Sequence, residues 1–204
     1  IAITQDRIKE KRFLEASGVS IAAFEVVEKI VQLNTALEKI GYPCVLKTTR
    51  FGYDGKGQVV LKSEADKEAA AALIGDHSCI LEAWVPFSKE LSVMIVRNRK
   101  GETTIFPVSE NIHVANILHE SIVPARISPA VSEKAIETAQ QIADALQLVG
   151  TLGIELFLTK DDDIFVNELA PRPHNSGHYT IEAMSLSQFD AHIRAVAGLS
   201  MPKA

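Results

Sequence analysis

Hydrophobic positions follow two periodicities along the chain, so helices and strands are both expected. Apolar residues three or four apart predict helices, with Thr4 and Ser63 as N-caps of two of them, over 4–17, 30–40, 63–74, 132–148, 179–184 and 188–197. Short apolar runs bounded by glycine, proline or polar residues predict strands over 43–47, 58–61, 79–85, 90–96, 103–108, 152–158 and 164–169. Residues 111–124 show no clear period, and no element is predicted there.

The strands over 152–158 and 164–169 are expected to form a hairpin. The aliphatic residues of the first strand share one face, so Glu155 points away from the core. If Lys160 pairs with Asp163 across the turn, Glu155 lies opposite Glu168, and facing like charges are destabilising. A bound cation resolves that conflict, and two carboxylates near Asn167 suit Mg²⁺. The alternatives are solvated glutamates on a surface hairpin, or a register shifted by one residue.

A glycine-rich stretch, TTRFGYDGKG, separates the strands over 43–47 and 58–61 and is expected to be a loop. Glycines let backbone N–H groups approach phosphate oxygens closely, and Lys47 and Lys56 supply cations. The stretch is neither a Walker A loop nor a Gly-x-Gly-x-x-Gly turn that opens a helix. A plain hairpin turn with a solvated lysine is the alternative, and the presence of Arg50, Tyr53 and Asp54 in the same loop favours a ligand.

Two further segments carry candidate chemistry. The strand end Glu82-Ala-Trp-Val85 can read an adenine through its backbone, with Glu90 accepting from ribose hydroxyls, although Trp84 and Val85 are more typical of a core. The loop PRPHNSG over 171–177 is dense in donors that suit a phosphate or carboxylate, and its two prolines are expected to exclude a helix. A capped loop before a helix is the alternative for the serine and asparagine of this loop.

Composition narrows the class of protein. The chain has 204 residues, formal net charge −5, 47% hydrophobic and 23% charged residues, which excludes a disordered or fibrous protein. Its mild acidity argues against binding nucleic acid by bulk charge, and no apolar run approaches the roughly 18 residues of a membrane span. Cys44 and Cys79 lie in apolar runs and are expected to be buried thiols in a reducing cytoplasm. No signal peptide is expected from the sequence, and the start at Ile1 is expected of a part of a longer polypeptide.

Taken together, six segments resemble the ATP-grasp superfamily and, within it, the N5-carboxyaminoimidazole ribonucleotide synthetases. They are QDRIKEKRFL, PCVLKTTRFGYDGKGQ, EAWVPFSKELSVMIVRNRKGE, PVSENIH, GTLGIELFLT and NELAPRPHNSGHYTIEA. The resemblance implies an α+β fold of two lobes, about 15–85 and about 86–204, whose antiparallel sheets and flanking helices enclose an ATP cleft. It also implies that the preATP-grasp domain and the C-terminal domain of the family are absent from this chain.

The resemblance further implies a ligase that carboxylates 5-aminoimidazole ribonucleotide with bicarbonate and ATP, through carboxyphosphate, in purine biosynthesis. Carried over residue by residue, it implies ATP-binding positions at Arg7, Lys47, Gly52, Tyr53, Asp54, Gly55, Lys56, Gly57, Gln58, Glu82, Ala83, Trp84, Val85, Glu90, His113, Asn167 and Glu168. It implies Mg²⁺ ligands at Glu155 and Glu168. Candidates for the bicarbonate and ribonucleotide side are Tyr53, Asp54, Arg172, His174, Asn175 and Ser176.

The expected partners are therefore small molecules, with no nucleic acid or membrane, in a cytoplasmic enzyme that forms a homodimer. Two rivals stay open. One is another ATP-grasp ligase, such as a glycinamide ribonucleotide synthetase or a biotin carboxylase, against which the PRPHNSGH segment argues. The other is a nucleotide-binding module without catalysis, against which the presence of Lys47, Glu155 and Glu168 argues.

Overall fold

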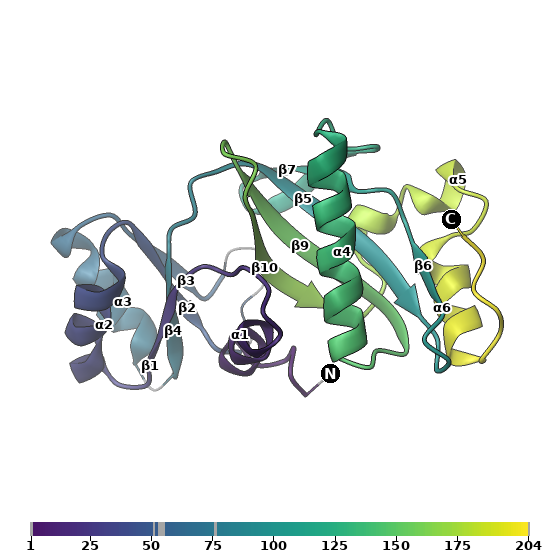
Figure 1. Cartoon of the computed structure of the whole chain (residues 1–204). Coiled ribbons are helices and arrows are strands. Elements are labelled where there is room, and N and C mark those ends of the chain that lie inside the picture. Colours follow the sequence, from purple (N-terminus) through teal and green to yellow (C-terminus); the bar gives the residue numbers. More distant parts are fainter. Residues whose placement is uncertain (1, 51, 53–55, 76, 204) are drawn as a thin grey trace. The chain divides into compact units, whose positions relative to one another are not determined.

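The computed structural model describes residues 2–50, 52, 56–75 and 77–203. The chain forms two compact units (Figure 1). Unit 1 comprises the residues up to 13, residues 21–86 and residues 115–117, whereas unit 2 comprises residues 14–20, residues 87–114 and the residues from 118 onward. Each unit is built on an antiparallel sheet of its own.

Unit 1 contains a four-stranded sheet in the order β1-β4-β2-β3. Its strands are β1 (Phe24–Val27), β2 (Cys44–Thr48), β3 (Gln58–Leu61) and β4 (Cys79–Ala83). The helices α2 (Leu33–Ile40) and α3 (Lys67–Ile74), each preceded by a 3-10 turn, η1 (Ile30–Gln32) or η2 (Glu64–Asp66), pack on one face. Alternate strand residues such as Cys44, Leu46 and Leu81 are fully buried against these helices. The residues between them therefore point to the opposite face.

The first helix of the chain is α1 (Arg7–Ala16), which starts later than the sequence pattern predicts. The prediction of Thr4 as its N-cap is wrong, because the Asp6 carboxylate accepts the backbone N–H groups of Ile8 and Lys9 at 3.2 and 3.3 Å. Aspartate is a strong capping residue since its side-chain oxygen satisfies donors that lack a partner in the first turn. Ser63 is confirmed as a cap, because its hydroxyl accepts from the N–H of Ala65.

Unit 2 contains a six-stranded sheet in the order β10-β9-β5-β7-β8, with β6 paired to β5. Its strands are β5 (Phe87–Arg97), β6 (Thr103–Ile105), β7 (Ser109–Val114), β8 (Ile117–Ile122), β9 (Gly150–Thr159) and β10 (Ile164–Ala170). The long helix α4 (Pro129–Ala145) packs on one face of this sheet. The C-terminal elements are η3 (Asn175–Gly177), α5 (Thr180–Ala183) and α6 (Gln188–Val196).

The two faces of the unit 2 sheet differ in what covers them. Leu91, Val93 and Ile95 of β5 are fully buried on the face toward α4. On the other face, Met94 and Val96 pack with Ala191 and Ala195 of α6. The part of this second face that α6 does not cover carries polar side chains. One face of the sheet is therefore apolar at one end and polar at the other.

The sequence pattern missed three strands. Phe24–Val27 is a short edge strand whose residues are mostly half-buried, so it shows no hydrophobic alternation. The strands β7 and β8 include Ser109, Glu110 and His113, and their polar residues on both faces obscure the period of two. The expectation that prolines exclude helical structure over 171–177 is also wrong in part. A 3-10 turn forms at Asn175–Gly177, because a proline restricts its own backbone and that of the residue before it, and both prolines precede this turn.

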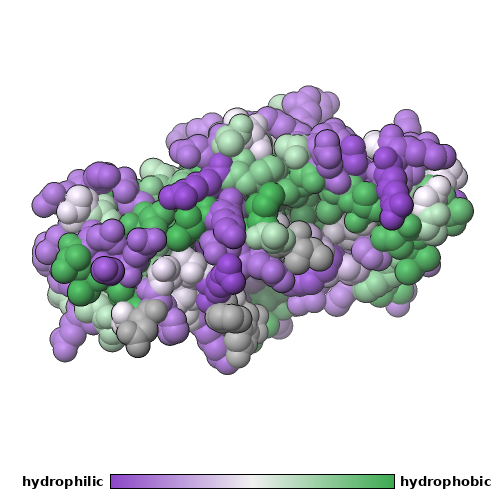
Figure 2. Space-filling model, turned by 90° about the horizontal axis from the view of Figure 1, so that it is seen from below, coloured by the Kyte–Doolittle hydropathy of each residue, from purple (hydrophilic) through white to green (hydrophobic). Residues whose placement is uncertain are grey.

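The surface of unit 2 carries hydrophobic residues over its C-terminal helix. Ile193 and Val196 of α6 are 62% and 45% exposed, and green residues gather there at the right of Figure 2. The predicted burial of the two thiols is confirmed, since Cys44 and Cys79 are free and fully buried, and burial raises the pKa of Cys44 to about 11. Across the described part of the chain, each helix is too short or too polar to cross a bilayer.

Candidate functional site

Three residues of unit 1 that were predicted to bind the nucleotide share one face of its sheet. Lys47 on β2 lies directly opposite Gln58 on β3, and Val45 lies opposite Glu82 on β4. Because cross-strand partners point to the same face, Lys47, Gln58 and Glu82 all lie on the side opposite the hydrophobic core. The Lys47 ammonium donates to Glu82 Oε2 at 2.9 Å.

A second lysine reaches the same carboxylate. Lys11 Nζ of α1 lies 3.4 Å from Glu82 Oε2, and the side chains of Lys11 and Glu82 are 3% and 5% exposed. Burial raises the pKa of Glu82, but Lys47 and Lys11 outweigh it and hold that pKa below its ordinary value. Burial lowers the pKa of Lys11, and the Glu82 carboxylate opposes that change in part. Unit 1 thus presents a buried carboxylate between two cations.

Two described glycines of the glycine-rich loop lie close to Thr48 and Arg7. Gly57 has a φ of +71°, and a Cβ placed there would lie 2.6 Å from Thr48 Oγ1, so only glycine fits without strain. A Cβ at Gly52 would lie 3.5 Å from an Arg7 guanidinium nitrogen, which places Arg7 beside the loop. Lys56 is exposed. The predicted residues Tyr53, Asp54 and Gly55 lie outside the described residues.

The segment predicted to read adenine begins on β4 and leaves it after Ala83. The N–H of Ala83 donates to Ala23 O at 2.8 Å, and the N–H of Trp84 donates to Pro43 O at 3.2 Å. Trp84 is 42% exposed, so the alternative of a core residue is wrong for its side chain, whereas Val85 is 9% exposed and fits it. Two of the backbone donors in this segment are therefore committed within unit 1.

The predicted pairing of Glu155 with Glu168 is confirmed, although the strand register near the turn differs from the one assumed. Near the turn the Thr159 N–H donates to Asp163 O, one residue away from the assumed pairing of Lys160 with Asp163. A bulge between Val166 and Glu168 then restores the register and places Glu168 opposite Glu155. Bulges re-aim side chains, and here Asn167 is the residue that the bulge contains. Two carboxylates therefore face each other on the polar end of the sheet.

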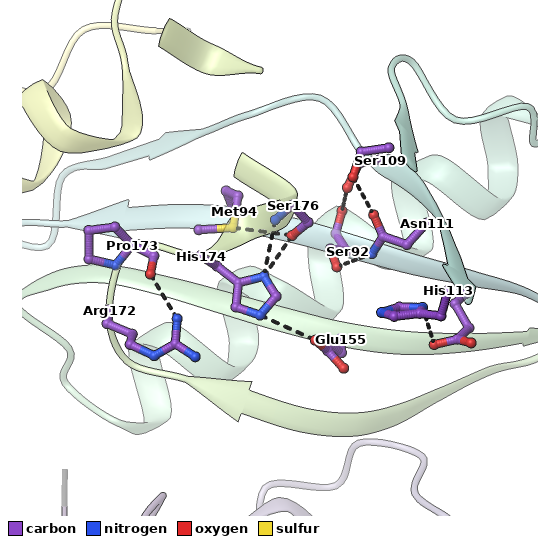
Figure 3. A network of polar contacts seen from close by, with 12 residues as sticks. Ser92, Met94, Ser109, Asn111, His113, Glu155, Arg172, Pro173, His174 and Ser176 are labelled. Carbon is purple, nitrogen blue, oxygen red and sulfur yellow. Dashed lines mark hydrogen bonds and ion pairs between the residues drawn. The ribbon is translucent and has the colours of Figure 1, made fainter. Parts of the chain in front are cut away.

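His174 joins this pair from the predicted anion-binding loop (Figure 3). Its Nε2 lies 3.2 Å from Glu155 Oε1, and its Nδ1 lies 2.8 Å from Ser176 Oγ. Burial raises the pKa of Glu155, but the hydrogen bond from His174 and the nearby His113 charge bring it below its ordinary value. The imidazole is thus held between a carboxylate and a hydroxyl.

A fully buried glutamine holds the backbone of His174. Gln188 Oε1 accepts the His174 N–H at 2.9 Å, and Gln188 Nε2 donates to His174 O at 2.8 Å. Gly177 leaves room for this side chain, because a Cβ at Gly177 would lie 2.6 Å from Gln188 Oε1. The loop conformation that aims His174 at Glu155 is therefore fixed from α6.

The remaining predicted residues of unit 2 divide into two groups. His113 Nδ1 lies 3.1 Å from Glu90 Oε2, and the Glu90 carboxylate raises the pKa of His113 despite its burial (Figure 3). Beside them, Asn111 donates to Ser92 Oγ at 2.6 Å. By contrast, Arg172 and Asn175 are exposed, and Arg172 donates to Pro173 O within its own loop. The structure brings His174 and Ser176 to the carboxylates but leaves Arg172 and Asn175 at the surface.

Sequence reasoning missed two residues of these groups. Lys11 follows Arg7 by four residues, so one helical turn places both on the same side of α1, and this spacing was an available signal. Gln188 lies far along the chain from His174, and no local pattern connects the two.

The facing carboxylates suit a hard cation. Within the described residues, no cluster of three or more His, Cys, Asp or Glu side chains is placed to hold a metal ion. Mg²⁺ does not need one, because it is usually bound by one or two carboxylates together with substrate phosphates and water. Glu155 and Glu168, with the amide of Asn167 adjacent in the bulge, form an oxygen donor set of that kind.

Comparisons with known proteins identify the family of this chain. Residues 12–189 match the model of the ATP-grasp domain. The N5-carboxyaminoimidazole ribonucleotide synthase of Bacillus subtilis strain 168 is 51% identical over 203 residues, which cover 100% of this chain and 53% of that protein. The chain therefore spans about half the length of the curated relatives it matches.

Solved structures give the same picture. A crystal structure of an ADP complex of N5-carboxyaminoimidazole ribonucleotide synthetase has a TM-score of 0.96 and 55% identity, covering 99% of this chain and 54% of that one. The Aspergillus clavatus N5-carboxyaminoimidazole synthase in complex with ADP and 5-aminoimidazole ribonucleotide has a TM-score of 0.92 and 35% identity, covering 99% and 53%. The predicted α+β fold is confirmed by these matches.

Proposed function

The chain belongs to the ATP-grasp family, and on that premise we propose that it binds Mg-ATP and serves the carboxylation of 5-aminoimidazole ribonucleotide with bicarbonate. The observation that carries the proposal is the pairing of Glu155 with Glu168 beside His174. The similarity to synthases of N5-carboxyaminoimidazole ribonucleotide along the whole chain supports this acceptor. The same proposal includes two lobes, over about 15–85 and 86–204. It also takes the flanking domains of the family to lie outside this chain.

In unit 1, we assign the nucleotide's phosphates to Arg7, Lys47 and the loop over 52–58. The cationic face around Lys47 supports this, because positioned ammonium and guanidinium groups stabilise charge on phosphate oxygens. Adenine is assigned to the segment over 82–85. Since the N–H groups of Ala83 and Trp84 are already bonded, the donor to the base is the N–H of Val85.

In unit 2, we assign the ribose to Glu90, with His113 and Asn167 beside the nucleotide. Glu155 and Glu168 are assigned as Mg²⁺ ligands, because a cation relieves the repulsion of two facing carboxylates. When bound, Mg²⁺ neutralises charge that develops on the transferring phosphoryl oxygens. His174 holds one Glu155 oxygen at 3.2 Å and so orients that carboxylate.

The acceptor side is assigned to the loop over 171–177, together with Tyr53 and Asp54. His174 and Ser176 lie next to the carboxylate pair, whereas Arg172 and Asn175 are exposed and available to an anionic substrate. In the reaction, a bicarbonate oxygen bonds to the γ-phosphorus as the bond to ADP breaks. The exocyclic amine of the ribonucleotide then bonds to the carboxyl carbon, loses a proton, and phosphate leaves. This sequence needs no protein nucleophile, in keeping with two buried cysteines.

The test is ADP release by the protein that carries this chain, with Mg²⁺, bicarbonate and 5-aminoimidazole ribonucleotide each omitted in turn. We expect turnover only in the complete mixture, with labelled bicarbonate entering the product. Turnover with a different acceptor, such as phosphoribosylamine with glycine, would favour another ATP-grasp ligase. Nucleotide binding without any turnover would favour a module that lacks catalysis.

The homodimer and the cytoplasmic location stay predictions. Sedimentation velocity of the protein that carries this chain tests the first, and cell fractionation tests the second.

A further inference from the structure

Lys11 is a buried lysine that the reaction itself does not require. It lies on α1 one turn after Arg7, its side chain is 3% exposed, and its ammonium is 3.4 Å from Glu82 Oε2. A buried ammonium is costly unless it is paired, so the position of this charge needs a reason.

Both lysines use the same oxygen of Glu82. Lys47 Nζ lies 2.9 Å from Oε2, and Lys11 Nζ lies 3.4 Å from it. The other oxygen, Oε1, is buried and has no hydrogen-bond partner within the described part of the chain. Two ammonium groups therefore contact one carboxylate. If either of them moves away, the other still pairs with the buried negative charge.

The two lysines differ in how free they are to leave. The side chain of Lys47 is 13% exposed, compared with 3% for Lys11. Lys47 also lies opposite Gln58, at the end of the glycine-rich loop. Lys47 is therefore the cation that can turn toward a ligand, and Lys11 is the one enclosed beside the carboxylate.

We propose that Lys11 is a positioning residue that stays on Glu82 as its counter-ion and so frees Lys47 to bind nucleotide phosphate. The inference rests on the proposed function, since it takes Lys47 as a phosphate ligand. Without Lys11, Lys47 would be the one ammonium group left on Glu82, beside the more general influence of the Arg7 charge. Moving Lys47 to a phosphate would then leave a poorly compensated buried charge, which opposes binding.

The test compares Lys11→Met, Lys11→Arg and the double variant Lys11→Met with Glu82→Gln, in the protein that carries this chain. Lys9→Met is the matched control, because Lys9 is an exposed lysine on the same helix. The probes are AMP-PNP with Mg²⁺, measured by calorimetry, and adenosine, measured by ligand-observed NMR. Thermal melts identify any variant that does not fold.

We expect Lys11→Met to weaken AMP-PNP binding by about 10-fold or more, as a charge left uncompensated on binding requires. Adenosine binding should change much less, because adenosine carries no phosphate. Lys11→Arg and Lys9→Met should bind like the wild type, and the double variant should regain part of the lost AMP-PNP affinity because Glu82→Gln removes the need for a counter-ion.

Equal losses for AMP-PNP and adenosine would overturn the inference, since they indicate a structural role. Unchanged AMP-PNP affinity in a folded Lys11→Met variant would overturn it as well, and so would a double variant no better than the single one. If the wild type itself fails to bind AMP-PNP, the proposed function falls and the inference falls with it. If the wild type binds and only the Lys11 results disagree, the proposed function stands.

Discussion

Each unit has a polar face on its sheet, but the charged groups on the two faces have opposite net signs. In unit 1, the buried carboxylate of Glu82 is shared by Lys11 and Lys47. In unit 2, two carboxylates, Glu155 and Glu168, face each other across β9 and β10. The first group has an excess of positive charge and the second an excess of negative charge, apart from what His174 supplies.

The two groups therefore differ in the sign of the ion that each can bind. A carboxylate between two ammonium groups is compensated by the chain itself, and its surplus cation is available to an anion. Facing carboxylates repel each other, even where His174 contacts Glu155, and they gain from a cation. Under the proposed function, nucleotide phosphate is the anion assigned to the first group, and Mg²⁺ is the cation assigned to the second.

Removing one member of the carboxylate pair is the strongest way to break this contrast. Glu168→Gln should lower ATP turnover by about 10²-fold or more, because it removes a metal ligand. Its melting temperature without metal should match or exceed that of the wild type, since like-charge repulsion is relieved. Glu155→Gln should lose as much activity without that gain, because it also replaces the charged acceptor for His174 with a neutral amide.

Glu133→Gln serves as the control, because Glu133 is exposed on α4. Near-normal turnover in both site variants at saturating Mg²⁺ would contradict the metal assignment.

A different carboxylate of unit 2 sharpens the contrast, because the chain compensates it fully. Glu110 accepts from Arg126 and Lys89, and these contacts lower its pKa to about 2 despite burial. A lowered pKa stabilises the folded state above the ordinary value of 4.5, and that stability is lost as the pH falls from 4.5 toward about 2. Glu110→Gln should therefore cost about 2–3 kcal/mol of unfolding free energy at pH 7.

Denaturant melts between pH 2 and 7 measure this effect. The variant should lose less stability than the wild type over the acid range, and parallel pH curves for the two proteins would contradict the role of Glu110.

Removing the glutamine that holds His174 beside the carboxylate pair should have a smaller but measurable effect. Gln188→Leu leaves the N–H and C=O of His174 without their buried partners, which should cost about 2 kcal/mol of unfolding free energy. Turnover should fall even below the melting temperature, because His174 is no longer held against Glu155. The neighbouring Phe189→Leu, at a residue that is 41% exposed, is the control. Full activity in a folded Gln188→Leu variant would show that this clamp is not needed.

On the side of unit 1, Gly57→Ala should have the smallest effect. The positive φ of Gly57 and the 2.6 Å approach of Thr48 Oγ1 predict a cost of about 1–2 kcal/mol and a higher KM for ATP. Gly41→Ala is the control, because Gly41 also has a positive φ but meets nothing within 4 Å. If both variants raise the KM equally, the close approach at Gly57 has no part in nucleotide binding.

Hydrophobic periodicity predicted the elements whose apolar faces are buried. The alternation of Leu152 with Ile154 and Leu156 located β9 and aimed Glu155 away from the core. Sequence could not give the strands β7 and β8, since Ser109, Glu110 and Asn111 are buried polar residues held by hydrogen bonds or ion pairs rather than by apolar packing. Their burial depends on partners elsewhere in the chain, which no local pattern contains.

The candidate site shows the same division. Sequence placed Glu155 opposite Glu168 by assuming a regular turn, and the structure reaches that pairing through a bulge that the sequence does not reveal. Gln188 was missed because it acts on His174, which is distant in sequence. For Lys11, the spacing from Arg7 indicated the shared side of α1, but its partner Glu82 is also distant in sequence. Local patterns therefore predicted many of the charged residues but not the contacts between distant residues that hold them in place.

The most direct measurement is the Mg²⁺ dependence of AMP-PNP binding in three proteins: the wild type, Glu168→Gln and Lys47→Met. Mg²⁺ should tighten binding to the wild type by about 10-fold or more, because a cation held by Glu155 and Glu168 would offset the charge of the nucleotide's phosphates. Lys47→Met should bind more weakly yet keep that Mg²⁺ ratio, whereas Glu168→Gln should lose most of it. A Glu168→Gln variant that keeps the full Mg²⁺ dependence would contradict the assignment of the cation to unit 2.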